Sequence, residues 1–135
     1  MDEDKRSPVA IVRAVIAALN RGDIDAVLAC CADDIVLWAP GAELNGQEVR
    51  GKEQLRQALE AGEDMWPDTW MAIRSIVASG DSVAVELVTA ATERQHYLVQ
   101  PMAAFYTVRD GLIVSQRNYY DLGALRFAAG ASEID

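Results

Sequence analysis

One stretch decides how the second half of this chain folds: Arg109-Asp110-Gly111-Leu112-Ile113-Val114-Ser115-Gln116-Arg117-Asn118-Tyr119-Tyr120-Asp121-Leu122. An Asp-Gly pair between two apolar segments is a strong hairpin signal, because both turn positions favour a positive φ. The strand that leaves the turn ends in Arg117, Tyr119 and Asp121. These side chains are spaced by two residues, so they share one face of a sheet if no β-bulge intervenes. This strand end is therefore the first place to look for a functional site.

The residues before this turn alternate with the same period of two. Strands are predicted, in chain order, over residues 69–78, 82–94, 98–109 and 112–121. The joints between them are short: 80–81, 95–97 and 110–111. Strands that short joints connect pair antiparallel with their neighbours.

The first half has the helical period instead. Helices are predicted over 9–19, 24–31 and 52–61, with a strand over 35–38, a loop over 41–50 and a last helix over 122–129. Ser7 and Asp23 are N-cap residues for the first two helices, and Gly22 and Gly62 end the first and third. Helices grouped before an antiparallel sheet indicate an α+β fold. We expect one domain over 1–135, with three helices packed over one face of a curved sheet and a pocket between them.

Composition excludes several classes of function. The 135 residues carry a formal net charge of −9, with no basic stripe that would neutralise nucleic-acid phosphates or an anionic membrane. Neither the neighbouring Cys30 and Cys31 nor the single His96 provides a disulfide framework or a zinc site. The charged N-terminus has no signal-peptide pattern, and no apolar run is long enough to cross a bilayer. A cytoplasmic protein without a zinc site is expected.

The chain resembles the nuclear-transport-factor-2-like superfamily of cone-shaped α+β folds. The resemblance rests on four segments: Leu19-Asn20-Arg21-Gly22-Asp23, Val49-Arg50-Gly51-Lys52, Asp110-Gly111-Leu112-Ile113 and Tyr119-Tyr120-Asp121. Within the superfamily it is most similar to the SnoaL-like group, which holds polyketide cyclases, and to the limonene-epoxide-hydrolase group. Both resemblances imply a small hydrophobic substrate and no cofactor. The superfamily also hosts binding and structural modules, so the fold alone does not assign an activity.

The resemblance implies roles for particular residues. In the SnoaL-like pattern an aspartate at the end of the final strand is the acid/base, and Asp121 falls there. The epoxide-hydrolase pattern is Asp-Arg-Asp. Arg94 matches its arginine and Asp121 its distal aspartate, but His96 stands where the second aspartate belongs.

Counting outward from a two-residue turn, Met102 faces Tyr119 and Gln100 faces Asp121. A tight joint at 95–97 would bring Arg94 and His96 to the same end of the sheet. The expected catalytic set is therefore Asp121, Arg94, His96 and Tyr119, with the substrate-binding residues Gln100, Trp38, Trp66, Met71 and Met102. These residues have structural alternatives. Asp121 would cap a last helix, with Arg117 as its ion partner or at an interface. Arg94 would pair with Glu93 or Glu86, His96 would be a solvated turn residue, and the aromatic residues would be core.

Three functions fit this pattern. In the first, Asp121 moves a proton next to a substrate carbonyl while Arg94, His96 or Tyr119 stabilises the enolate oxygen. In the second, Asp121 activates a water to open an epoxide, with Gln100 holding the water and Arg94 or His96 assisting the oxygen. In the third, the chain binds a small molecule or a partner without catalysis. A sheet face that the helices leave uncovered also predicts a homodimer.

Overall fold

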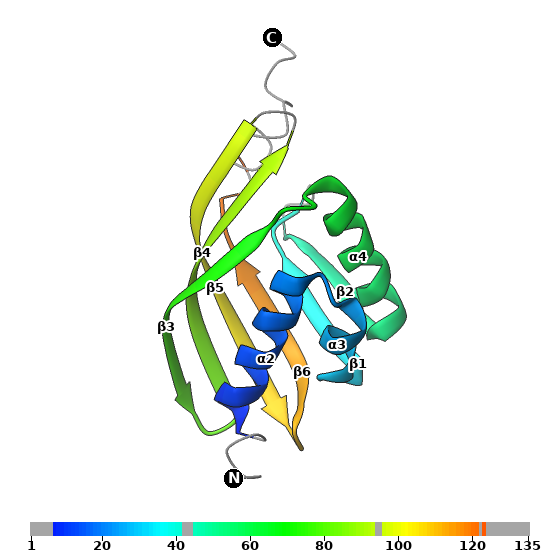
Figure 1. Ribbon diagram of the computed structural model, residues 1–135. Coiled ribbons are helices and arrows are strands. Elements are labelled where there is room, and N and C mark those ends of the chain that lie inside the picture. The colour runs from blue at the N-terminus through cyan, green and yellow to red at the C-terminus, as the bar shows by residue number, and fades with distance from the viewer. Residues whose placement is uncertain (1–6, 42–44, 94–95, 122, 124–135) are drawn as a thin grey trace.

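The structure is a computed structural model that describes residues 7–41, 45–93, 96–121 and 123 (Figure 1). Its elements follow in chain order: α2 (Pro8–Arg21), α3 (Ile24–Ala29), β1 (Cys31–Ala39), β2 (Gln47–Arg50), α4 (Gly51–Met65), β3 (Trp70–Ser79), β4 (Ser82–Glu93), β5 (His96–Arg109) and β6 (Leu112–Tyr119). The predicted last helix over 122–129 lies outside the described residues apart from Gly123. The six strands form one sheet in the order β2-β1-β6-β5-β4-β3.

Local capping sets the first two helices as predicted. The Ser7 hydroxyl accepts the Ala10 N–H at 3.1 Å, and the Asp23 carboxylate accepts the Ala26 N–H at 3.1 Å. Gly22 ends α2 at a φ of 71°, a conformation that favours glycine. The prediction that α3 continues to Cys31 was wrong. The Cys30 carbonyl already accepts the Ile113 N–H at 2.8 Å, so the chain has joined the sheet at that point.

The third helix is longer than predicted, because Gly62 lies inside α4 instead of ending it. A glycine costs an exposed helix interior only about 1 kcal/mol, and nothing in the structure crowds Gly62. The helix ends at Met65, immediately before Trp66-Pro67. Proline lacks an N–H and disfavours a helical conformation at the preceding residue, which explains this end point.

The four predicted strands are present, and their antiparallel pairing is confirmed. The turn residues Asp110 and Gly111 have φ values of 54° and 79°, as expected for this hairpin. The register differs from the count made from the turn, because it shifts between Ile113 and Ser115. The extra residue moves every later β6 residue by one, so Tyr119 pairs with Ala103 and not with Met102.

The sheet is mixed, whereas the sequence predicted an antiparallel one. β1 pairs parallel with β6, and β2 pairs antiparallel with β1 within a segment that was predicted to be a loop. β2 is four residues long and mostly exposed, so it has no apolar alternation that would reveal it. Gly46 precedes it with a φ of 79°, and a Cβ there would lie 2.4 Å from the Trp38 ring.

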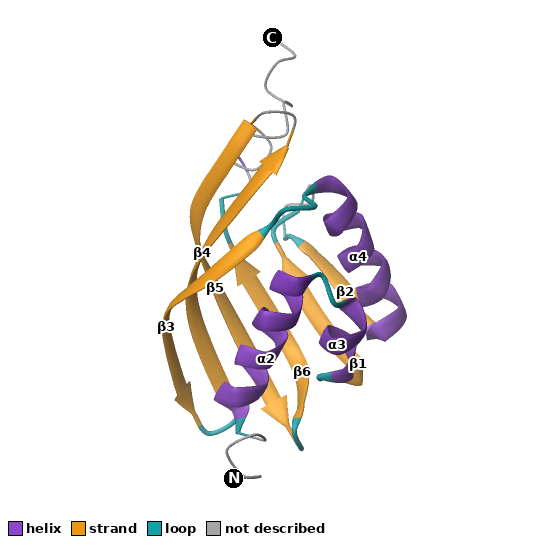
Figure 2. Cartoon of the chain, in the orientation of Figure 1, coloured by secondary structure: helices purple, strands orange, loops and turns teal. Residues whose placement is uncertain are grey.

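The helices lie over one face of the curved sheet, which confirms the predicted α+β cone (Figure 2). α2 packs across β3, β4, β5 and β6, while α4 covers β1 and β2. The core between these layers is formed by the inward side chains of both, including Val12, Val15, Ile35, Leu87 and Ile113. The opposite face of the sheet, called the outer face below, carries no helix of the described chain (Figures 1 and 2).

Burial of Cys31 makes the stability of this core depend on pH. Burial raises the pKa of the Cys31 thiol from 9.0 to about 11, and the neighbouring Cys30 adds to the shift. As the pH rises, the unfolded chain therefore loses this proton first. The free energy of unfolding should be unaffected by this thiol below pH 9 and should fall by roughly 2 kcal/mol between about pH 9 and pH 11.

Urea unfolding at about pH 8 and about pH 10 measures this effect. Cys31→Ala serves as the control, because it has no thiol to ionise and should show a flatter pH profile. Equal losses of stability in both proteins would show that Cys31 is not the titrating group.

Candidate functional site

A cavity of about 490 Å³ lies between the helices and the sheet. It is formed by the α2–α3 turn, the last two turns of α4, the segment that follows α4, and the inward face of four strands. Its lining residues are Leu19, Asn20, Arg21, Gly22, Asp23, Ile24, Val27, Ala58, Leu59, Gly62, Glu63, Trp66, Pro67, Thr69, Met71, Thr89, Met102, Asn118 and Tyr120. A pocket of this size accommodates a small organic molecule.

Apolar side chains form much of the wall. Trp66, Met71 and Met102, three of the five predicted substrate-binding residues, line the cavity. Trp66 was predicted from its position in a loop, and it is the C-cap residue directly after α4, with only 8% of its surface exposed. An aromatic ring and two flexible thioethers suit a flat apolar ligand, because they fill irregular space around it.

The sheet side of the cavity adds polar groups that carry no charge. The Asn118 Oδ1 accepts from the Gln116 Nε2 at 2.9 Å, which orients the Asn118 Nδ2 as a donor for a bound molecule. Burial raises the pKa of the Tyr120 phenol, so its hydroxyl stays protonated and can donate. The Thr89 hydroxyl contacts the Met102 sulfur at 3.5 Å. Two donors on one wall are suited to the oxygen of a carbonyl or an alcohol.

Asn20 fixes the opposite wall. Its Nδ2 donates to the Met71 carbonyl and its Oδ1 accepts from the Met71 N–H, both at 2.8 Å. This pair of bonds ties the end of α2 to β3, and both residues line the cavity. Asn20 belongs to the stretch Leu19–Asp23 that carries the family resemblance, but its role could not be predicted, because a bond between residues 51 positions apart leaves no pattern in a sequence.

Charged groups of the cavity come from the helices. Arg21 pairs with Asp23 at 3.6 Å, and Asp23 also caps α3, so both are committed to the local structure. Glu63 projects from α4 toward the α2–α3 turn, where its Oε1 would lie 3.4 Å from a Cβ at Gly22. The carboxylates of the lining are therefore at the helical rim and not on the sheet wall.

The bulge in β6 places part of the predicted site elsewhere. Tyr119 and Arg117 lie on the outer face of the sheet. Asn118 and Tyr120 face inward instead, because the extra residue in β6 shifts the alternation of the strand by one position. Trp38 pairs with Arg117 and also lies on the outer face, where its indole packs 5.2 Å from the Tyr119 ring. The predicted convergence of Tyr119 and Trp38 on the pocket was therefore wrong.

Gln100 and Asp121 do meet, although not as an amide against a carboxylate. Gln100 is 8% exposed, and its Oε1 accepts the backbone N–H of Asp121 at 3.1 Å. This bond holds the chain directly after Tyr120, which lines the cavity. The Asp121 side chain is exposed and is not part of the cavity lining. Arg94 and the side chain of His96 lie outside the described residues; the backbone of His96 begins β5.

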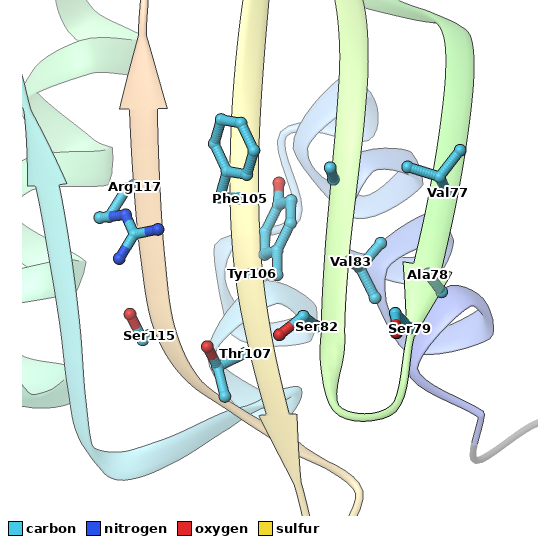
Figure 3. Close-up of a pocket in the computed structure, with 11 residues that line it drawn as sticks. Val77, Ala78, Ser79, Ser82, Val83, Phe105, Tyr106, Thr107, Ser115 and Arg117 are labelled. Atoms are coloured by element: carbon cyan, nitrogen blue, oxygen red, sulfur yellow. The ribbon is translucent and has the colours of Figure 1, made fainter.

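The outer face has a shallow hollow of about 280 Å³ that the sequence did not indicate (Figure 3). The Arg117 guanidinium lies 6.0 Å from the centre of the Phe105 ring, and Phe105 contacts Tyr119 edge-on at 5.7 Å. Below them the hydroxyls of Ser82, Thr107 and Ser115 occupy adjacent strands (Figure 3).

Among the residues that the structure describes, no group of three or more His, Cys, Asp or Glu side chains is arranged to hold a metal ion. No helix in that part of the chain has the length and apolarity to cross a membrane.

Comparison with known proteins identifies the family. The SnoaL-like domain matches residues 12–116. The chain belongs to the SnoaL-like domain family. The match covers the helices, β1 to β5 and the start of β6, and it ends before Arg117, so the end of β6 lies outside the assignment of this SnoaL-like chain. No curated protein matches the sequence.

Solved structures similar to this SnoaL-like chain share its fold. A candidate polyketide cyclase from Xanthomonas campestris pv. campestris is 29% identical, with 93% of this chain and 97% of that chain covered and a TM-score of 0.76. An NTF2-like protein from Burkholderia xenovorans LB400 is 28% identical, with 90% and 95% covered and a TM-score of 0.75. IdmH, a candidate polyketide cyclase from Streptomyces antibioticus, is 23% identical, with 92% and 99% covered and a TM-score of 0.78.

Proposed function

We propose that this SnoaL-like protein is a cofactor-independent acid/base enzyme that acts on a small hydrophobic molecule containing a carbonyl group. The cavity of about 490 Å³ carries this proposal, since it combines apolar side chains with uncharged donors on its sheet wall. The reaction class is cyclisation, double-bond isomerisation or dehydration, all of which pass through an enolate. The similarity to two candidate polyketide cyclases supports this class.

Asp121 is the proposed general acid/base. Its carboxylate takes a proton from the carbon next to the carbonyl, and the electron pair of that C–H bond moves to the carbonyl oxygen as the enolate forms. The donors at Tyr120 and Asn118 stabilise this oxygen. In isomerisation the Asp121 carboxyl returns the proton to a carbon of the extended enolate. In cyclisation the enolate carbon forms a bond to a second carbonyl carbon of the substrate, and the carboxyl protonates the alkoxide that results. In dehydration the carboxyl protonates the β-hydroxyl, which leaves as water while the electron pair of the enolate forms the double bond. The support for Asp121 is its place directly after Tyr120 and the Gln100 bond to its backbone.

Arg94 and His96 remain proposed assistants at the oxygen. In the sequence Arg94 directly follows β4, and His96 is the first residue of β5, four residues before Gln100.

A second candidate function is binding without catalysis. It is favoured by the exposure of Asp121 and by the uncharged sheet wall of the cavity. In this case the cavity takes the same class of apolar molecule and releases it unchanged.

Proton exchange separates these two functions without knowledge of the natural product. The protein is incubated in D2O with 2-tetralone, a flat apolar ketone, and loss of its α-proton signal is followed by NMR. An enzyme of the proposed kind accelerates this exchange. A binding protein quenches its tryptophan fluorescence on adding the ketone but leaves the exchange rate unchanged.

Ala58→Trp and Ala61→Trp form a matched pair for this experiment. Both residues are exposed on α4, but only Ala58 lines the cavity. We expect Ala58→Trp to abolish exchange and binding, whereas Ala61→Trp should retain both. Equal activity in the two variants would place the reaction outside the cavity.

A further inference from the structure

Tyr106 is a buried polar side chain with no part in the proposed reaction. It belongs to the hydrophobic core and is only 3% exposed. Among the described residues its hydroxyl forms no hydrogen bond, and the nearby Cys31 thiol donates instead to the Val27 carbonyl at 3.4 Å. A buried hydroxyl without a partner costs free energy, and native proteins rarely keep one without a use.

The Tyr106 hydroxyl points along the sheet toward the cavity. Figure 3 shows the ring lying along β5, with its oxygen in the direction in which β6 runs. The next inward residue of β5 in that direction is Ala104, which is fully buried and has only a methyl group as its side chain. Two residues of a strand span about 7 Å, which is close to the length of a tyrosine side chain. The hydroxyl therefore reaches the level of Ala104.

Two residues of the cavity adjoin Ala104. Met102 is the next inward residue of β5, and Asn118 pairs directly with Ala104 from β6. Gln116, which pairs with Tyr106, extends the same way and donates from its Nε2 to the Asn118 Oδ1 at 2.9 Å. The phenol and this amide pair therefore converge at the inner end of the cavity.

Met102 allows a ligand to approach this inner end. Its side chain is flexible, and its polar contact with the Thr89 hydroxyl, at 3.5 Å, is weak. A change of the Met102 rotamer widens the gap between Met102 and Asn118 and opens the cavity toward the Tyr106 hydroxyl.

We propose that the Tyr106 hydroxyl is a specificity-determining group, which bonds a second oxygen of the substrate remote from the reacting carbonyl. This inference rests on the proposed function, because it takes the cavity as the ketone site. Burial raises the pKa of the Tyr106 phenol, so the hydroxyl stays protonated and can donate to that oxygen.

The spacing of the donors indicates the class of substrate. Tyr120, a proposed donor to the reacting carbonyl, is two residues beyond Asn118, which is about 7 Å in an extended chain. A fused two-ring ketone with an oxygen at its far end spans a similar distance. A site built to bond such an oxygen should reject an analogue that lacks it, because a buried polar group would remain unpaired.

Two ketones that differ only at the far end test the proposal. In 6-methyl-2-tetralone, a methyl group of similar size replaces the hydroxyl of 6-hydroxy-2-tetralone. Their dissociation constants are measured by quenching of tryptophan fluorescence for the wild-type protein, Tyr106→Phe and Tyr97→Phe. Tyr97 lies on the same strand but is 70% exposed, so Tyr97→Phe makes the same chemical change away from the cavity.

The wild-type protein should prefer the hydroxy ketone. This preference, expressed as the ratio of the two dissociation constants, should fall about tenfold in Tyr106→Phe and stay unchanged in Tyr97→Phe. Tyr106→Phe should unfold at the same urea concentration as the wild-type protein or at a higher one. The variant loses a hydroxyl that has no partner among the described residues, so its fold loses no bond.

A ratio that is unchanged in Tyr106→Phe overturns the proposal. Equal weakening of both ketones would assign the hydroxyl to the reacting carbonyl and exclude a second-oxygen site. A lower urea midpoint for Tyr106→Phe would show that the hydroxyl is bonded within the fold, which also excludes it. These three outcomes leave the proposed function standing. Absence of quenching by either ketone would instead contradict the cavity as a ketone site, and with it both proposals.

Discussion

Asp121→Asn is expected to lower the rate of ketone α-proton exchange by about 10²–10⁴-fold, the usual contribution of a positioned general base. Asparagine has nearly the same shape as aspartate, but its amide cannot take a proton. The bond from the Asp121 N–H to Gln100 is made by the backbone, so the substitution preserves it. Ketone binding, measured by fluorescence quenching, should therefore change by less than about twofold.

Asp110→Asn is the matched control for this variant. It makes the same chemical change in the hairpin turn at the other end of the sheet, where asparagine tolerates the observed φ of 54°. The control should exchange the ketone at the wild-type rate. If Asp121→Asn also exchanges at that rate, Asp121 is not the base, and binding without catalysis becomes the better reading of this cavity.

The helices and the four long strands could be predicted because local rules dominate there. Ser7, Asp23 and Gly22 act through bonds and backbone angles within a few residues, and the Asp110-Gly111 turn does the same. The parallel pairing of β1 with β6 joins segments about 80 residues apart, and β2 depends on β1 for its existence. No local pattern encodes either feature.

The residues of the candidate site were also predicted only where their placement does not depend on distant parts of the chain. Trp66, Met71 and Met102 were found because their position relative to α4 or their strand parity does not depend on β6. The run Leu112-Ile113-Val114 is apolar throughout, so alternation cannot show where the bulge falls. That single extra residue exchanges Tyr119 for Tyr120 as the phenol facing the cavity. Asn118 and Tyr120 were missed for this reason.

Asn20→Ala is expected to reduce the free energy of unfolding by about 2–4 kcal/mol. The substitution removes both 2.8 Å bonds to Met71 and leaves the backbone N–H and carbonyl of that residue without partners beneath α2. These two groups form the junction between the end of α2 and β3, so the cavity wall should loosen as well. Ketone binding should weaken in proportion, because Asn20 and Met71 both line the cavity.

Asn118→Ala provides the comparison, since it also truncates an asparagine of the cavity. Its side chain is bonded to another side chain, Gln116, and no backbone group loses a partner in the variant. We expect a loss of at most about 1 kcal/mol in urea unfolding. The difference in unfolding free energy between the two variants measures how much stability the Asn20 amide adds by bonding to the backbone of Met71. Equal losses would mean that α2 is held to β3 by apolar packing alone, and that the shape of the cavity does not depend on Asn20.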